Sequence, residues 1–232
     1  MMFPAPGMRA QIQSNMASTL NIDWLLDLAR DILAGQGLKR ERRDLLNGMD
    51  DAILGRPGGR LLFHPYISTA GERGPFLEPA ARAQFTGLET GMGFADMMRA
   101  VFEGLCLAAR DCYEAMGSLP EEIRITGGAA RSKALRLLLA SALHAPVRSV
   151  AREEAGAAGA AMMAAIERKI FPGMAECAAR WVDPALGPLT RPDAAMTRSF
   201  DRLMPIYRGI RNSMRPVWRA LRDARAEAAH GA

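Results

Sequence analysis

Cysteine is scarce in this sequence of 232 residues, occurring only as Cys106, Cys112 and Cys177. An odd number of cysteines without Cys-x-x-Cys spacing argues against a disulfide framework and offers no zinc site. We therefore expect three reduced thiols in a cytoplasmic protein, and no metal ligands on this chain.

Long apolar runs are also lacking. No run reaches the roughly 20 residues needed to span a bilayer, and the sequence of residues 4–9 is too interrupted by proline, glycine and arginine for a secretory signal. We expect no membrane partner. Apolar residues nevertheless make up 49% of the chain, which supports a sizeable core and excludes wholesale disorder.

Acidic residues are few near the C-terminus. From Arg198 onward there are eight arginines against three acidic residues, so this stretch holds the whole net charge of +5. Basic segments can bind nucleic acid or anionic membranes. This one lacks interleaved aromatic residues for base stacking and any nucleic-acid motif. We expect a solvated basic helix over 196–232 that packs on or extends from a domain over 1–195, and no nucleic-acid partner.

The first half of the chain predicts two helices and a strand. Residues 18–34 have a helical apolar stripe formed by Trp24, Leu25, Leu28 and Ile32. Residues 61–67 read as a short apolar strand. From about 94 to 116, apolar residues recur every three or four positions, which predicts a long helix with one apolar face.

The second half of the chain alternates between strand and helix patterns. Strands are predicted over 122–126 and 146–150, with helices over 129–144 and 151–168. This order predicts a βαβ unit with parallel pairing. The tail from about 196 to 229 is expected to be helical, with Pro205 and Pro216 as starts or kinks.

A glycine-rich turn is predicted where the first of these strands ends, at Thr126-Gly127-Gly128. Glycine permits positive φ and close approach of a ligand. The helix that follows offers unpaired N–H groups and a positive dipole end, which suit a phosphate, and Arg131 and Ser132 could add donors. The turn is neither a Walker A loop nor a dinucleotide fingerprint. An ordinary structural turn is the competing interpretation.

Small residues fill the start of the next helix, between Glu154 and Ala160. They allow a ligand or another element to approach the backbone closely. We expect ordinary helix packing at Gly159. For Gly156, packing and a ligand contact both stay open.

Several ordered segments together resemble the C-terminal domain of the FGGY carbohydrate kinases. The similarity extends over nearly the whole chain, and the order of the motifs makes it specific. The segments are Asp23-Trp24-Leu25, HPYISTAGERGPFLEP at 64–79, AQFTGLETGMGFADMMRAVFEG at 83–104, Thr126 to Ser132, Glu153-Glu154-Ala155-Gly156-Ala157-Ala158-Gly159-Ala160-Ala161, Trp181-Val182 and Tyr207-Arg208.

The resemblance implies a fold class and an activity. The fold is α/β, the C-terminal lobe of an actin-like, ribonuclease H-like ATPase, with a helical C-terminal tail. The activity is phosphorylation of a sugar or polyol hydroxyl from ATP with Mg²⁺. By position in the motif, the backbone of Gly127, Gly128 and Ala129 would line the nucleotide, and Ser132 would lie beside the adenine.

The sequence also departs from the family pattern. The family's third glycine is Ala129 here, and its usual Trp, Gln and Asp in the next helix are Leu135, Leu137 and Ser141. These features are more similar to the erythritol-kinase branch than to xylulose kinases, and they leave the substrate open.

The family's N-terminal lobe has no counterpart in these residues. That lobe contains a phosphate-contacting hairpin, the aspartate that serves as general base and most of the acceptor site. We therefore expect an N-terminally truncated fragment that lacks the first strands of its own lobe, is inactive alone and is prone to form homo-oligomers. The alternative is a catalytically dead interaction module that pairs with another chain.

Other polar residues are ambiguous. Glu72 and Arg73 could reach the cleft or form an ion pair that pins their turn. Asp96 and Glu103 could form an acid–base pair, but we prefer a helix cap and a buried hydrogen-bonded carboxylate. His64 is expected to be a packed histidine.

Overall fold

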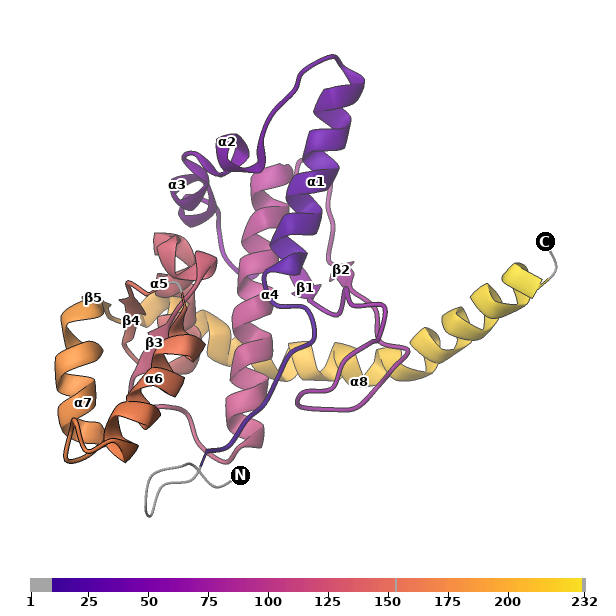
Figure 1. Cartoon of the computed structure of the whole chain (residues 1–232). Helices are drawn as coiled ribbons and strands as arrows, with labels where there is room; N and C mark the ends of the chain where they lie inside the picture. The colour runs from indigo at the N-terminus through magenta and orange to yellow at the C-terminus, as the bar shows by residue number, and fades with distance from the viewer. Residues whose placement is uncertain (1–9, 153, 231–232) are drawn as a thin grey trace.

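The structure is a computed structural model that describes residues 10–152 and 154–230 (Figure 1). Glu153 of the second small-residue motif and the interrupted segment 4–9 lie outside the described residues. The elements in chain order are α1 (Leu20–Gly35), α2 (Arg42–Leu46), α3 (Met49–Leu54), β1 (Leu62–His64), β2 (Gln84–Thr86), α4 (Phe94–Ala115), β3 (Ile123–Ile125), a 3₁₀ turn (Gly128–Arg131), α5 (Lys133–Leu143), β4 (Val147–Val150), α6 (Ala155–Glu167), α7 (Met174–Trp181), a second 3₁₀ turn (Asp183–Ala185), β5 (Leu186–Thr190) and α8 (Ala194–His230).

Helix α4 is the central element. Its existence and bounds confirm the predicted long helix, and the predicted apolar row lies on one face of it, opposite a polar row that includes Arg99, Glu103 and Arg110. Most side chains from Met98 to Cys112 are buried because α1, α3, α5, α8 and β1 surround the helix. An added Cβ at Gly104 would lie 2.2 Å from the carbonyl oxygen of Phe63, so only glycine lets β1 approach this closely.

The predicted βαβ unit is confirmed. Strands β3 and β4 are parallel, with Ile123 opposite Val147, and α5 connects them. Strand β5 pairs antiparallel with β4, so β3 is an edge strand of the three-stranded sheet in the part of the chain that the structure describes. The second sheet pairs β1 with β2, antiparallel. The sequence did not predict β2, which has only three residues.

Helix α1 forms where the sequence predicts a helix, but most of its predicted apolar stripe is exposed. The buried apolar side chains are Ile22, Leu25 and Leu26, which join the core against α4. Leu25 belongs to the predicted apolar stripe, but the other three residues of that stripe, Trp24, Leu28 and Ile32, are 40%, 42% and 64% exposed. The helix carries two apolar rows with helical spacing, and only one of them meets the core.

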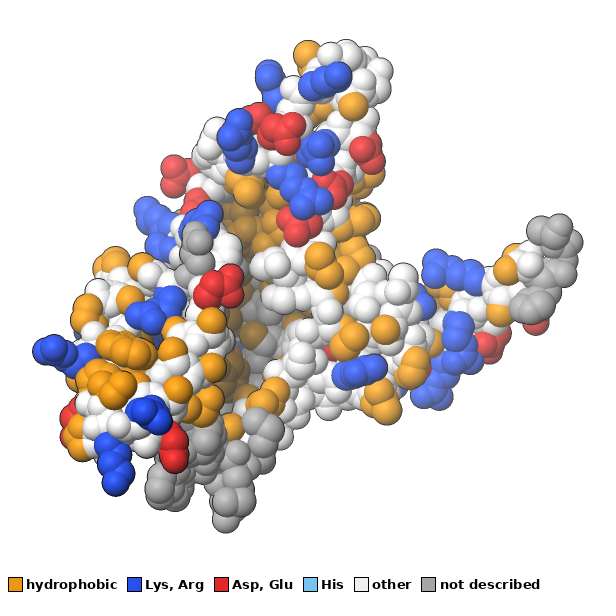
Figure 2. All heavy atoms as spheres, in the orientation of Figure 1, with side chains coloured by type: hydrophobic (Ala, Val, Ile, Leu, Met, Phe, Trp, Pro, Cys, Tyr) orange, Lys and Arg blue, Asp and Glu red, His pale blue; other side chains and the backbone are white. Residues whose placement is uncertain are grey.

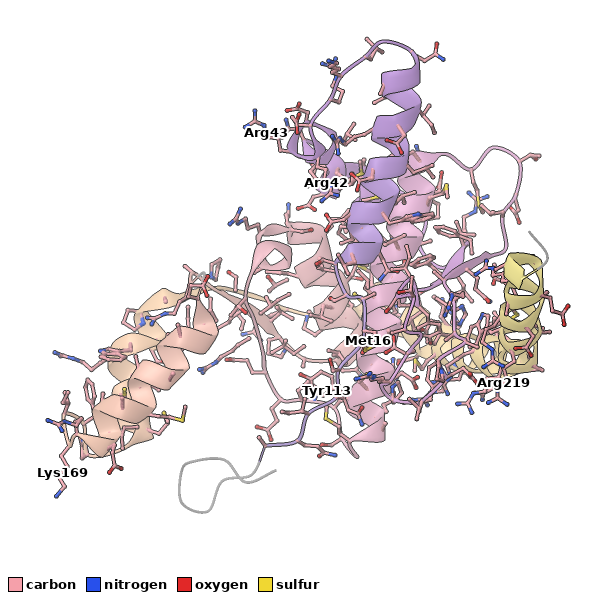
Figure 3. All side chains as sticks on the ribbon, turned by 45° about the vertical axis from the view of Figure 1, so that its right-hand side comes forward. Met16, Arg42, Arg43, Tyr113, Lys169 and Arg219 are labelled. Carbon is pink, nitrogen blue, oxygen red and sulfur yellow. The ribbon has the colours of Figure 1, made fainter. Side chains whose placement is uncertain are left out.

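Helices α6 and α7 form a pair that stands away from the rest of the molecule, with Lys169 at its tip (Figure 3). Residues 155–166 of α6 carry no charge, yet only Met162 and Ala165 are buried. An apolar helix is ordinarily covered on all sides, so α6 leaves an uncharged face open to solvent.

Helix α8 runs without interruption from Ala194 to His230. Asp193 directly precedes it, and Oδ1 of Asp193 accepts the N–H of Met196 at 2.8 Å, so neither proline starts a helix. Pro205 and Pro216 lie inside it, and Figure 1 shows the helix curving along its length before its C-terminal end projects from the body, as prolines in a helix are expected to cause.

The basic tail packs on the body, as one of the two expected arrangements, and is not solvated over its whole length. Its first half contributes Phe200, Met204 and Tyr207 to the main core. Arg208 and Arg211 both pair with the buried Asp111 of α4, and Arg219 pairs with the buried Glu78 at 2.7 Å (Figure 3). Much of the positive charge therefore fastens α8 to the body. The division at residue 195 stays a prediction.

The structure bears on two expectations from the composition: the state of the cysteines and the lack of a membrane-spanning segment. The three cysteines are buried free thiols, and burial raises the pKa of Cys112 to about 12. Among the described residues, no helix combines the length and the apolar character that crossing a bilayer requires.

Candidate functional site

The glycine-rich turn joins a strand to a helix, as predicted. Strand β3 ends at Ile125, and Gly127 follows with φ +79°, a backbone conformation that favours glycine. The helix begins later than predicted, at Lys133, after the 3₁₀ turn. Gly127 and Gly128 are exposed, and a Cβ added at either would meet no atom within 4 Å. The backbone of the turn is therefore accessible to a ligand.

Both small-residue motifs lie at one edge of the sheet. Because β3 and β4 are parallel, the turn after β3 and the residues Ala151 and Arg152 after β4 both leave the sheet at its carboxyl edge. Ligands of open α/β sheets bind at this edge. In α6, a Cβ at Gly156 or Gly159 would meet no atom within 4 Å, so the packing expected at Gly159 is not seen within the described ranges.

The side chain of Ser132 caps the N-terminus of α5, and its hydroxyl proton is already donated to a carboxylate. Its Oγ accepts the N–H of Leu135 at 3.0 Å and donates to Oδ1 of Asp50 on α3 at 2.6 Å. Oδ2 of Asp50 accepts the N–H of Lys133, also at 2.6 Å. A carboxylate thus occupies the N-terminus of α5, where the sequence analysis expected a phosphate.

Asp50 is the residue that the sequence analysis missed at this site. It precedes Ser132 by 82 residues and belongs to a six-residue helix that was not predicted. No local pattern connects the two positions. A second contact holds the turn from the helix side, because Arg136 donates from Nη1 to the carbonyl oxygen of Ala130.

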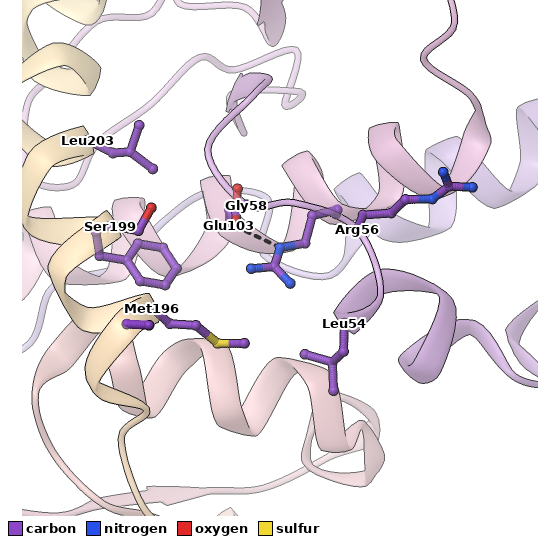
Figure 4. A pocket seen from close by; sticks show the side chains of 10 residues that line it. Leu54, Arg56, Gly58, Glu103, Met196, Ser199 and Leu203 are labelled. Atoms are coloured by element: carbon purple, nitrogen blue, oxygen red, sulfur yellow. Dashed lines mark hydrogen bonds and ion pairs between the residues drawn. The ribbon is translucent and has the colours of Figure 1, made fainter.

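The pair Asp96 and Glu103 has the structural roles that we preferred. Oδ2 of Asp96 accepts the N–H of Gly93 at 2.9 Å, at the start of α4. Glu103 is buried, pairs with Arg99 at 2.7 Å and accepts the N–H of Gly59 at 2.9 Å. Arg99 and Glu103 form the polar wall of a hollow of about 210 Å³ between α3, α4 and α8 (Figure 4). The wall residues satisfy each other.

The remaining polar candidates are also part of the framework. Glu72 is 1% exposed, and its Oε1 accepts the N–H groups of Met16, Arg73 and Gly74. It therefore pins the turn through backbone contacts rather than through an ion pair with Arg73. His64 is fully buried, as expected of a packed histidine. No three potential metal-binding side chains cluster anywhere in the described ranges.

A parallel βαβ unit with a glycine-rich turn at its carboxyl edge is an arrangement that holds phosphorylated ligands in α/β proteins. The solved structures that are similar to this chain are sugar kinases of the actin-like ATPase fold. Xylulose kinase from Rhodospirillum rubrum matches with a TM-score of 0.71 and 25% identity, covering 88% of this chain and 40% of that one. Gluconate kinase from Lactobacillus acidophilus matches with a TM-score of 0.71 and 23% identity, covering 85% and 39%.

The chain belongs to the FGGY family of carbohydrate kinases, whose C-terminal domain it matches over residues 4–168. It is 51% identical over 215 residues to erythritol kinase from Brucella abortus (strain 2308), covering 93% of this chain and 41% of that protein. Identity to xylulose kinase from Bacillus subtilis (strain 168) is 25%, covering 90% and 40%. The chain thus spans about two fifths of the length of the curated relatives it matches, as a carbohydrate kinase C-terminal domain.

Proposed function

We propose that the chain is the ATP-binding part of a kinase that phosphorylates a hydroxyl of erythritol, or of a related polyol or pentulose. Identity favours erythritol: 51% to the Brucella erythritol kinase against 25% to the Bacillus xylulose kinase over similar lengths. The fold alone does not select the acceptor, because xylulose and gluconate kinases have a similar fold.

The observation that carries the proposal is the open glycine turn at the carboxyl edge of the sheet. The neighbouring protein atoms leave the space over Gly127 and Gly128 free. Backbone groups of Gly127, Gly128 and Ala129 would therefore line the nucleotide. Ser132 would lie beside the adenine as a packing contact, because its proton is donated to Asp50.

Magnesium would be held mainly by the phosphates of ATP in this proposal. Mg²⁺ prefers phosphate oxygens with one or two carboxylates and several waters. The described residues offer no cluster of three metal-binding side chains. The turn residues would bind and orient the nucleotide, and the metal would supply charge neutralisation for phosphoryl transfer.

The alternative is an interaction module without catalysis. The edge position of β3 and the open face of α6 favour it, because unpaired edges and uncovered apolar faces invite another chain. A module of this kind does not need to bind nucleotide. Nucleotide binding therefore separates the two functions.

Calorimetry with ADP and with ATP and Mg²⁺ tests the nucleotide site. We expect wild type to bind and Gly128→Val to show no measurable binding, because the isopropyl group would occupy the ligand's place. The substitution fits the protein alone, since a Cβ at Gly128 meets no atom within 4 Å.

Gly35→Val is the matched control. Gly35 is exposed in α1, and its added Cβ also meets no atom within 4 Å. This variant should bind nucleotide as wild type does. Equal affinity of wild type and Gly128→Val would place the nucleotide elsewhere, and a wild type that binds neither nucleotide would favour the interaction module.

A further inference from the structure

The first turn of α5 has hydrogen-bond donors that are already in use. The N–H of Lys133 is donated to Oδ2 of Asp50, and the N–H of Leu135 is donated to Oγ of Ser132. The Ser132 hydroxyl in turn donates to Oδ1 of Asp50. The start of a helix presents free N–H groups and a partial positive charge, which attract anions. Here one carboxylate of the protein itself takes the place of the anion.

Asp50 is held in this position by α3, which packs beside α5 (Figure 1). Ile53, on the next turn of α3, is fully buried in the main core. Its carbonyl oxygen accepts an N–H of the buried Arg99 at 3.2 Å. The helix that carries the carboxylate is therefore anchored both by packing and by a hydrogen bond. Asp50 is a fixed part of the site rather than a freely rotating surface side chain.

The two ends of the glycine turn differ in charge and in open space. At the α5 end, the partners of Asp50 are a hydroxyl and a backbone N–H, so these contacts supply no cation to balance its charge. Figure 2 shows basic and acidic side chains intermingled over α2 and α3, so the surroundings are not a uniformly positive surface that would draw phosphate there. At the other end, a Cβ added at Gly127 or Gly128 meets no atom within 4 Å.

We propose that Asp50 is a specificity-determining residue that keeps phosphate away from the start of α5. A nucleotide then lies on the turn with its nucleoside towards Ser132 and its phosphates towards Gly127 and Gly128. Phosphate oxygens accept hydrogen bonds and carry negative charge, whereas the base and ribose are uncharged and carry donors. A ligand is rejected where it meets a like charge and finds its donors occupied. This inference rests on the proposed nucleotide site at the turn.

Inorganic pyrophosphate distinguishes this role from a purely structural one, because it has phosphate groups but no nucleoside to place at the α5 end. If Asp50 only supported the turn, its removal would weaken the binding of every ligand. Exclusion of phosphate predicts the opposite sign for pyrophosphate. Without the carboxylate, the N–H of Lys133 and the hydroxyl of Ser132 become donors for an anion at a helix N-terminus.

Calorimetry with ADP and with inorganic pyrophosphate compares wild type with Asp50→Ala. We expect wild type to bind ADP and to bind pyrophosphate far more weakly. Asp50→Ala should bind pyrophosphate about tenfold more tightly than wild type does, while its affinity for ADP should not rise by the same factor. Asp50→Asn loses the charge but keeps one acceptor oxygen, so its affinity for pyrophosphate should lie between the two. Circular dichroism checks that the variants are folded.

Asp51→Ala is the matched control, because it removes the same charge from the exposed next position and should bind pyrophosphate as wild type does. The proposal is overturned by a wild type that binds pyrophosphate as tightly as ADP, by the lack of any gain in the folded Asp50 variants, or by an equal gain in Asp51→Ala. A gain of pyrophosphate binding in Asp50→Ala, with no ADP binding by wild type, would reject the nucleotide site and still support exclusion of phosphate by Asp50.

Discussion

At the scale of single residues, His64 links stability to pH. Its ring stacks on Tyr207 with centroids 4.3 Å apart, and Nε2 donates to the carbonyl oxygen of Tyr207 at 3.0 Å. Nδ1 is buried without a hydrogen-bond partner. Burial, aided by the charge of Arg211 and opposed by the bond to Tyr207, lowers the pKa of His64 from 6.5 to about 4. The folded protein therefore favours the neutral form of the His64 imidazole.

We therefore predict that the protein loses stability as the pH falls from about 6.5 towards 4. In this window the unfolded chain binds a proton that folded His64 does not, so the free energy of unfolding decreases, by about 3 kcal/mol in total. Above pH 6.5 this contribution is constant. Urea unfolding at several pH values measures the loss. His64→Gln, which keeps an N–H donor, should be less stable at neutral pH but should show a smaller decrease. An equal decrease in both proteins would show that other groups control it.

The prediction of single-residue roles was most successful where the signal is local. Two glycines at a strand end predicted the turn, and a carboxylate three residues into a helix predicted the Asp96 cap. Asp50 could not be found in this way, because its contact with Ser132 joins positions 82 residues apart. A hydrogen bond between residues that are far apart in the sequence produces no regular spacing, so a sequence pattern does not reveal it.

At the scale of elements, the α5 N-terminus depends on a residue of α3. We predict that Asp50→Ala lowers the free energy of unfolding by about 1–2 kcal/mol, because two hydrogen bonds to the carboxylate and a favourable contact with the helix dipole are lost. Chemical denaturation measures the change. Asp51→Ala, at the exposed neighbouring position, should change stability by less than about 0.5 kcal/mol. Similar losses for both variants would mean that Asp50 matters only for α3 itself.

The faces of helices were harder to predict than their existence. In α1, the row Trp24, Leu28, Ile32 and the row Ile22, Leu26 both have helical spacing, so periodicity could not choose between them. In α4, the polar row that includes Arg99, Glu103 and Arg110 is buried together with the apolar row, because five elements surround the helix. Short elements such as β2 and α2 carry too few residues to show any period.

At the scale of the whole molecule, we predict that these 232 residues alone show no polyol-dependent release of ADP. The carboxylate that the structure places at the turn, Asp50, is already bound to Ser132 and Lys133. A general base contributes about two to four decades in rate, and lost positioning of the acceptor costs more. A coupled assay with erythritol, xylulose, ribulose and glycerol measures turnover.

The control for this assay is the intact Brucella erythritol kinase, followed by the chain mixed with the part of that relative outside the matched span. Activity recovered in the mixture would support the kinase function. Turnover by the chain alone would show that the catalytic groups lie within it.

The contacts of α8 also have a consequence for biosynthesis. Tyr207 meets His64 and Tyr66 across more than 140 residues, and Arg219 meets Glu78 across 141. Strand β1 is therefore synthesised long before the helix that covers it. At about 5–20 residues per second, roughly 7 to 30 seconds separate the two on the ribosome. During that interval His64 and Tyr66 lack the contacts that α8 supplies, so this side of β1 stays open to other contacts until α8 emerges.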